Sequence, residues 1–257
     1  MNTENKKKIV TALNKAFLEA GELSLLLRKK GLTEEIKTDN TPVTNGDLEV
    51  NKILTERIKK LTSEIPIISE ESSLNKTNTN LNNFWLIDPI DGTYDYINNK
   101  DEFTINAALI INNRPEIGII YAPAKKRLFY TYENNLSFEK TENIENKLDC
   151  KKKTNLGEIK AVSYSEKLNP IIQDFHKKFK VTEFKKMKSS LKFCVVATGE
   201  YDLYIAEPRA SEWDIAAGHA ILKNAGGIIT DFDGNEILYG KQDFKNPSLI
   251  LKRSERL

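Results

Sequence analysis

The sequence predicts a layered globular protein of mixed α and β structure. In the first half, two helical patterns precede a run of short apolar segments, and in the second half such segments alternate with helical patterns. This order is typical of helices packed in layers against sheets. The length agrees, because 257 residues with 39% hydrophobic side chains can bury a large core without disulfides or a structural metal.

Charge and cysteine content exclude several classes of protein. The chain has 39 basic and 37 acidic residues, a net charge of +2, which gives no argument for a nucleic-acid or membrane partner. No apolar run approaches the roughly 20 residues of a membrane-spanning helix. The two cysteines, Cys150 and Cys194, suit a reducing compartment and not a disulfide framework. We therefore expect a cytoplasmic protein with no stable membrane insertion and no nucleic-acid partner.

Two amphipathic helices open the chain. Apolar residues recur at helical spacing over residues 9–20, and this pattern predicts a long helix that ends near Gly31. The segment 37–46 is rich in turn-forming residues and side-chain oxygens. A second amphipathic pattern covers residues 47–61 and predicts the second helix.

Two apolar segments then predict buried strands that are each followed by acidic residues. They cover residues 65–68 and residues 84–87, and the polar segment 72–83 between them is expected to be a loop. Pro89 has a fixed φ and cannot donate a hydrogen bond, so we expect the second of these strands to end at Asp88.

The remaining strands and helices suggest two domains. Three further apolar segments predict consecutive strands, the first two joined as a hairpin: residues 103–111, 117–121 and 128–132. After a polar stretch, strands and helices alternate: strands near residues 160–163 and 201–205, and helices near 170–179, 191–198 and 215–225. We expect an N-terminal α+β domain over residues 1–140 and a C-terminal α/β domain over residues 141–257.

Asp88 and Asp91 are the most informative pair of residues. Two carboxylates held close across a turn repel each other unless a cation lies between them, and Mg²⁺ prefers oxygen ligands of this kind. The amides of Gly92 and Thr93 then begin a helix, where exposed N–H groups can bind phosphate. A metal beside such a site indicates phosphoryl chemistry. The alternative is structural, with Asp91 as a helix cap and Asp88 as a solvated turn residue.

Three separated motifs resemble a known family. WLIDPIDGT at residues 85–93, the acidic pair at 70–71 and WDIAAG at 213–218 resemble the lithium-sensitive, magnesium-dependent phosphatases of the inositol monophosphatase superfamily. The resemblance extends from about residue 5 to the C-terminus. It implies a layered αβαβα sandwich of the inositol monophosphatase and fructose-1,6-bisphosphatase type.

Two further segments are similar to one branch of that superfamily, the 3′(2′),5′-bisphosphate nucleotidases. They are KTDNTPVTNGD at residues 37–47 and SSLKFC at residues 189–194. The resemblance implies hydrolysis of adenosine 3′,5′-bisphosphate to AMP and phosphate by a metal-activated water. One alternative is an inositol monophosphatase or another sugar-phosphate phosphatase. A second is a non-catalytic protein that binds anions or RNA through its lysines.

The resemblance also implies residue roles. It implies a site for two or three Mg²⁺ ions with five ligands: Glu70, Asp88, the Ile90 carbonyl, Asp91 and Asp214. It implies that Asp47 and Thr93 orient and deprotonate the attacking water, so that no phosphoenzyme forms. It implies four contacts to a small phosphorylated substrate: Gly92, Thr93, Ser189 and Lys192. The branches of the superfamily leave open whether the protein is a monomer or a homodimer.

The sequence departs from the nucleotidase pattern in two places. Tyr164 and Glu166 stand where that pattern has a basic run, and Ala206 stands where it has an arginine. Arg209, three residues further on, is the candidate to replace that arginine. Both departures affect the choice of substrate and leave the expected metal ligands intact.

Lysines near the second motif and one histidine are interpreted structurally. Lys185, Lys186 and Lys188 are interpreted as a solvated face, whereas Lys192 lies between apolar neighbours and is favoured as a functional residue. His219 is interpreted as a packed helical side chain.

Overall fold

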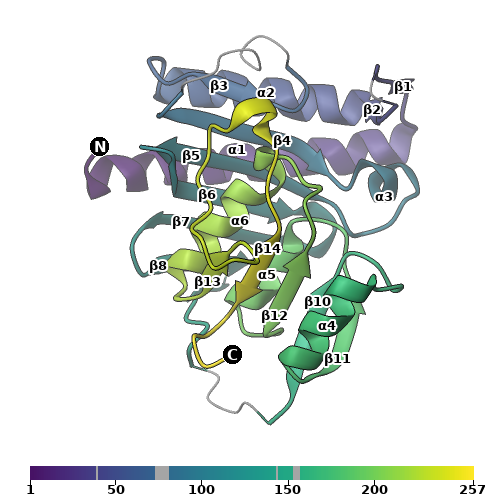
Figure 1. Ribbon diagram of the computed structural model, residues 1–257. Helices are drawn as coiled ribbons and strands as arrows, with labels where there is room; N and C mark the ends of the chain where they lie inside the picture. The colour runs from purple at the N-terminus through teal and green to yellow at the C-terminus, as the bar shows by residue number, and fades with distance from the viewer. Residues whose placement is uncertain (39, 73–80, 143, 153–156) are drawn as a thin grey trace.

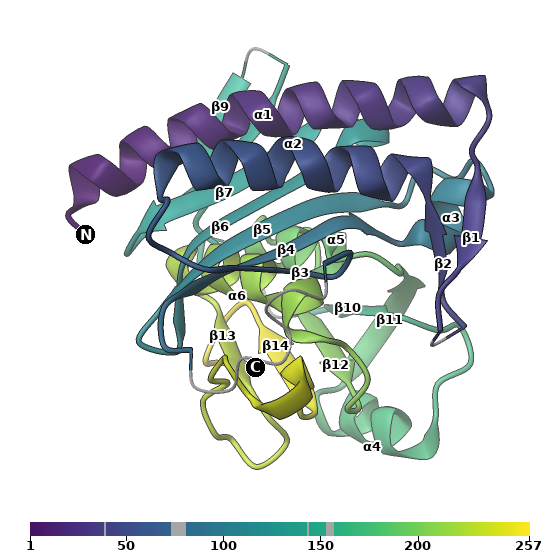
Figure 2. The ribbon, with the colours of Figure 1, turned by 90° about the horizontal axis from the view of Figure 1, so that it is seen from above.

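Five layers make up the molecule in the order α, β, α, β, α (Figures 1 and 2). The computed structural model describes residues 1–257 except 39, 73–80, 143 and 153–156. Helices α1 and α2 cover one face of a large sheet, α5 and α6 lie between the two sheets, and α4 covers the outer face of the small sheet. The expected αβαβα sandwich is confirmed. The predicted loop over residues 72–83 lies mostly outside the described residues.

The helices follow the predicted amphipathic patterns closely. Within the described ranges the α-helices are α1 (Thr3–Lys30), α2 (Asn45–Leu61), α3 (Thr93–Ile97), α4 (Pro170–Lys178), α5 (Leu191–Ala197) and α6 (Glu212–Asn224), with short 3₁₀ helices η1 (Pro123–Lys125) and η2 (Gln242–Phe244). Helix α1 ends directly before Gly31, as expected. None of these helices has the length together with the apolarity that crossing a bilayer requires.

The large sheet has seven strands in the order β3-β4-β5-β6-β7-β8-β9, and only the β3–β4 pair is parallel. Its strands are β3 (Ile67–Ser69), β4 (Phe84–Asp91), β5 (Thr104–Ile111), β6 (Arg114–Ala122), β7 (Arg127–Glu133), β8 (Leu136–Thr141) and β9 (Ile144–Lys147). The sheet therefore extends to Lys147, past residue 140, where we placed the domain boundary. Strand β9 lies at the edge and is exposed along its length, and β8 beside it has only two apolar residues, Leu136 and Phe138, so the apolar pattern of both strands is weak.

The small sheet has five strands in the order β11-β10-β12-β14-β13. Its strands are β10 (Ile159–Ser163), β11 (Val181–Lys186), β12 (Leu203–Ala206), β13 (Ile228–Thr230) and β14 (Leu249–Lys252). A separate two-stranded ribbon joins β1 (Glu34–Ile36) to β2 (Pro42–Thr44) within the segment expected to form turns.

Strand β4 continues through Pro89, so the expectation that it ends at Asp88 was wrong. Asp88 pairs with Asn106 and Asp91 pairs with Thr104 of β5. Two residues of β4 between these pairs therefore oppose one residue of β5, which is the geometry of a β-bulge. A bulge accepts proline inside a sheet because it interrupts the ladder of backbone hydrogen bonds at that point.

Candidate active site

The bulge in β4 turns Asp88 and Asp91 toward the same face of the sheet. In a regular strand, residues three apart face opposite sides, because side chains alternate. Here Trp85 and Ile87 pack with the residues below α1 and α2, and Ile90 joins that same core cluster. The extra residue has therefore reversed the alternation before Ile90. As a result both Asp88 and Asp91 line one cavity on the side of α6.

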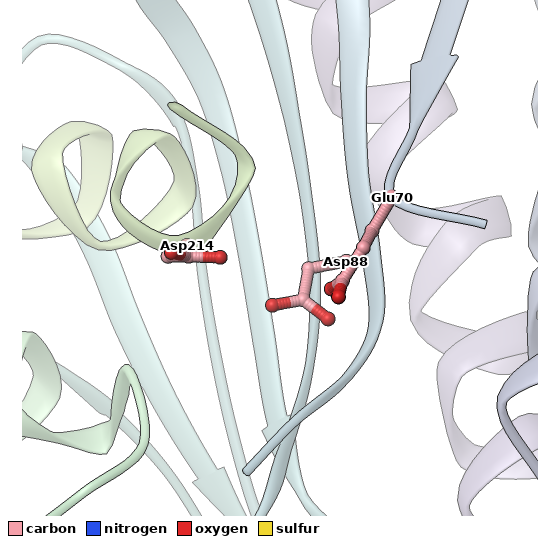
Figure 3. Close-up of side chains that lie close together, drawn as sticks. All are labelled: Glu70, Asp88 and Asp214. Carbon is pink, nitrogen blue, oxygen red and sulfur yellow. The ribbon is translucent and has the colours of Figure 1, made fainter. Parts of the chain in front are cut away.

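Three carboxylates from three different elements converge in that cavity (Figure 3). Glu70 follows β3, Asp88 lies in β4 and Asp214 lies in the first turn of α6, and their nearest carboxylate oxygens all lie within 4.8 Å of one another. Asp214 is held by a capping box in which the amide of Ser211 donates a hydrogen bond of 2.7 Å to its Oδ2.

The electrostatics of the three carboxylates fit a bound cation. Burial raises the pKa of Asp88 well above its usual range, and the neighbouring charges of Glu70, Asp91 and Asp214 raise it further. Burial and the charge of Asp91 likewise raise the pKa of Asp214. Oδ1 of Asp88 is buried and has no hydrogen-bond donor among the described residues. A divalent cation would relieve this repulsion, and an oxygen-only set of ligands suits Mg²⁺.

Asp91 and the Ile90 carbonyl border the same cavity but lie outside the tightest group. The carboxylate of Asp91 accepts a hydrogen bond from the backbone amide of Ser190. Burial raises the pKa of Asp91 to about 6, against the opposite effect of Lys192. The Ile90 carbonyl oxygen lies 3.1 Å from the hydroxyl of Thr93. The structure thus gathers all five expected ligands at one cavity.

Asp47 and Thr93 are in contact. The hydroxyl of Thr93 lies 3.3 Å from Oδ1 of Asp47. Asp47 is the third residue of α2, and its Oδ2 accepts hydrogen bonds from the amide of Thr44 at 2.8 Å and the hydroxyl of Thr44 at 2.6 Å. This capping box holds a buried carboxylate in one orientation close to the acidic cluster. Burial raises the pKa of Asp47, against the effect of the hydrogen bonds from Thr44.

Lys37 is a residue of the site that the sequence analysis missed. Its Nζ lies 3.3 Å from Oε1 of Glu70 and 2.7 Å from Oε1 of Glu71. Burial raises the pKa of Glu71 to about 7, against the opposing hydrogen bond from Lys37. Lys37 begins the segment that resembles the nucleotidases, and that position was the available signal. The ammonium group partly neutralises the acidic cluster and fixes the direction of Glu70.

The cavity has a volume of about 360 Å³, within the range of small-molecule sites. Beside the carboxylates it is lined by Gly92 and Thr93, and on another side by cationic and aromatic side chains: Lys188, Lys192, Arg209, Tyr94, Tyr164 and Tyr204. Nζ of Lys192 donates hydrogen bonds of 2.6 Å to the carbonyls of Lys188 and Ser189. Burial lowers the pKa of Lys192 to about 8, against the opposing charge of Asp91.

The two neighbouring serines take different places. Ser189, expected to contact substrate, is fully buried and is not among the residues that line the cavity. Ser190 lines the cavity instead, and its hydroxyl lies 2.7 Å from Oδ1 of Asn106 and 2.8 Å from the hydroxyl of Thr104. The conformation of the turn before α5 decides which of the two serine side chains faces the cavity. The motif alone does not reveal that conformation.

Most of the remaining candidates take structural roles. His219 is buried, and its Nδ1 lies 2.9 Å from the hydroxyl of Tyr239, so its interpretation as a packed side chain is confirmed. Lys185 and Lys186 are exposed, as expected for a solvated face, and Lys186 lies 3.6 Å from a carboxylate oxygen of Glu166. Lys188 differs, because it lines the cavity.

The layered sandwich and the converging carboxylates together define a family. The sequence profile of the inositol monophosphatase family matches residues 5–256, and the chain belongs to that family. The 3′(2′),5′-bisphosphate nucleotidase CysQ of Buchnera aphidicola subsp. Acyrthosiphon pisum is 36% identical over 222 residues, which cover 84% of this chain and 81% of that protein. The protein of the same name from Aggregatibacter actinomycetemcomitans is 34% identical over 242 residues, covering 91% and 88%.

A solved structure shows the same arrangement of the chain. CysQ from Bacteroides thetaiotaomicron, a bacterial member of the inositol monophosphatase family, superimposes with a TM-score of 0.77 at 28% identity. The superposition covers 97% of this chain and 98% of that one. The expectation of this superfamily from the three motifs is therefore confirmed.

Proposed function

We propose that the protein is a magnesium-dependent 3′(2′),5′-bisphosphate nucleotidase that hydrolyses adenosine 3′,5′-bisphosphate to AMP and phosphate. One observation carries the proposal: Glu70, Asp88 and Asp214 converge within 4.8 Å beside the Asp47–Thr93 contact. The relatives named as nucleotidases, at 34% and 36% identity over most of the chain, support the choice of substrate.

The ligands proposed for magnesium are the five groups that border the cavity: Glu70, Asp88, the Ile90 carbonyl, Asp91 and Asp214. When bound, the ions supply two effects, a lower pKa for the attacking water and neutralisation of the charge on the leaving oxygen. The carboxylates supply the negative charge that holds the ions, and the chain places them on β4, on the turn directly after β3 and on α6.

Asp47 and Thr93 are proposed to direct the attacking water. The hydroxyl of Thr93 can accept a hydrogen bond from a water molecule while it donates its own proton to Asp47, 3.3 Å away. Asp47 is buried, so its electrostatic effect on that hydroxyl is not screened by solvent. The pair therefore fixes the direction of the water and draws its proton away from the phosphorus atom.

The backbone at Gly92 is proposed to bind the phosphoryl oxygens. Gly92 has a φ of 97°, and a Cβ there would lie 2.9 Å from the carbonyl of Glu102. This left-handed conformation lets the chain leave β4 and begin α3 at once. The first amides of α3 have no partners within the helix, so they can donate to the transferred phosphoryl group.

The test is a comparison of substrates. Purified protein with Mg²⁺ should release phosphate from adenosine 3′,5′-bisphosphate faster than from inositol 1-phosphate or fructose 1,6-bisphosphate, and EDTA should abolish the release. Inositol 1-phosphate hydrolysed as fast as the nucleotide would favour the alternative, an inositol or sugar-phosphate phosphatase. Absence of phosphate release, with RNA binding that EDTA does not affect, would favour a non-catalytic anion-binding protein.

The reaction partner is therefore a small phosphorylated molecule. We further propose that the protein is a cytoplasmic monomer or homodimer, and size-exclusion chromatography with light scattering distinguishes the two states.

A further inference from the structure

Arg209 and Tyr164 form a stacked pair on the wall of the cavity. Cζ of Arg209 lies 3.2 Å from the centroid of the Tyr164 ring, and both residues line the cavity. Tyr164 directly follows β10, whereas Arg209 lies in the connection from β12 to α6. The pair therefore joins two segments of the small sheet at a position five residues before Asp214.

No carboxylate among the described residues neutralises Arg209. In the described part of the chain Arg209 forms no ion pair with a carboxylate, and its side chain is exposed at the cavity. Lys192 faces the same aromatic side chains, with its Nζ 5.9 Å from the centroid of the Tyr164 ring and 5.3 Å from that of Tyr204. Two cations thus approach one region of the cavity, and their repulsion contributes to the lowered pKa of Lys192.

The stacked geometry prepares Arg209 to bind a phosphate. A guanidinium group that lies on an aromatic ring keeps its N–H groups in the plane parallel to that ring. Those donors can bind two oxygens of a phosphate, while the ring restricts the rotamers of the arginine before the ligand arrives. Lysine offers only a point charge, so Lys192 and Arg209 would act differently on the same anion.

We propose that Arg209, stacked on Tyr164 and assisted by Lys192, binds the phosphate of the substrate that is not hydrolysed, and that this contact sets the preference for bisphosphates over monophosphates. The inference rests on the proposed function and deepens it. It also accounts for the departure at Ala206, because Arg209 supplies the positive charge absent there, and it gives Tyr164 the role of supporting Arg209.

The test compares two substrates that differ only in the second phosphate, adenosine 3′,5′-bisphosphate and adenosine 3′-monophosphate, at saturating Mg²⁺. The measured quantity is the ratio of their kcat/KM values. We expect Arg209→Gln to lower this ratio at least tenfold, chiefly through a higher KM for the bisphosphate. Arg209→Lys should give an intermediate ratio, because it keeps the charge and loses the planar donors. Tyr164→Leu should lower the ratio less than Arg209→Gln, because the cation remains but is no longer held.

A matched control removes the same charge elsewhere. Lys185→Gln neutralises an exposed lysine of β11 that does not line the cavity, and it should leave the ratio within twofold of wild type. An equal loss for both substrates in Arg209→Gln would make Arg209 a structural residue and overturn the proposal, as would an unchanged ratio. A wild-type protein that hydrolyses both nucleotides equally well also overturns it. A wild-type protein that hydrolyses neither nucleotide instead overturns the proposed function.

Discussion

Replacing Gly118 by alanine should displace the helix that carries Asp214. Gly118 lies in β6 where α6 crosses the large sheet, and a Cβ at this position would lie 2.4 Å from the carbonyl oxygen of Ala217 and 2.9 Å from Cβ of Ala220. Ordinary contacts begin at 3.4 Å, so the helix and strand must separate by about 1 Å. The obstructing atoms belong largely to the helix backbone, so no side-chain rotation can relieve the overlap.

The size of the effect follows from that displacement. Overpacking of a core typically costs about 1–3 kcal/mol, which for a chain of this length corresponds to a fall in Tm of roughly 2–10 °C. Ala217 is less than one helical turn from Asp214, so the carboxylate moves with it. A displacement of about 1 Å at a catalytic group can cost on the order of 100-fold in rate. We therefore expect kcat/KM to fall by about 10- to 100-fold in Gly118→Ala.

Thermal unfolding and steady-state kinetics across a range of Mg²⁺ concentrations measure both effects. Gly234→Ala is the control, because a Cβ there has open space and the cost is limited to backbone strain at a φ of 85°. It should lower Tm without changing kcat/KM. Full activity in Gly118→Ala, whatever its Tm, would refute the idea that α6 is held in place by this close approach.

Three other substitutions test the site, a buried histidine and a buried ion pair. Asp91→Asn should lower kcat more than tenfold with little change in Tm, because it removes an anionic ligand, and a loss below about 1.4 kcal/mol in activation free energy would contradict that role. Burial lowers the pKa of His219 to about 3, so between about pH 6.5 and 3 the unfolded state binds a proton that the folded state does not. The free energy of unfolding of the wild type should therefore fall by up to about 1.4 kcal/mol per pH unit as the pH is lowered. The difference in Tm between wild type and His219→Gln should shrink over the same range. A difference that stays constant from pH 7 to 5 would show that His219 titrates normally. Arg253→Met removes the ion-pair partner of the buried carboxylate of Asp202 and should lower the free energy of unfolding, measured with denaturant, by about 3–5 kcal/mol. The double variant that adds Asp202→Leu should recover part of that loss. Absence of any recovery would contradict the pairing.

The sequence predicted the fold best where strands are apolar. The segments that became β5 and β6 are buried on both faces, and the asparagines at 112 and 113 adopt the positive φ values, 50° and 61°, of a tight hairpin. Strand β9 is exposed along its whole length, and β11 is exposed at every residue after Val181. Their pairing depends on neighbours distant in the sequence, so a local pattern could not reveal them.

In the candidate site too, residues close together in the sequence could be predicted, whereas contacts between residues far apart in the sequence could not. The carboxylates at 88 and 91 could be predicted because two acidic residues around a proline have a clear chemical meaning. Lys37 precedes α2 in the sequence and Glu71 follows it, and only folding brings the two side chains into contact. Arg209 was a candidate from the sequence, but its stacking on Tyr164 could not be inferred, because 45 residues separate the two positions.

Because of the bulge at Pro89 and Ile90, the site requires a fixed number of residues between Asp88 and Asp91. Loops that join strands accept added or lost residues, because their ends need only remain close in space. Between Asp88 and Asp91, one residue more or one fewer would point the second carboxylate at α1 and α2. A single inserted alanine would then be as damaging as the loss of the carboxylate, although every charged group would still be present.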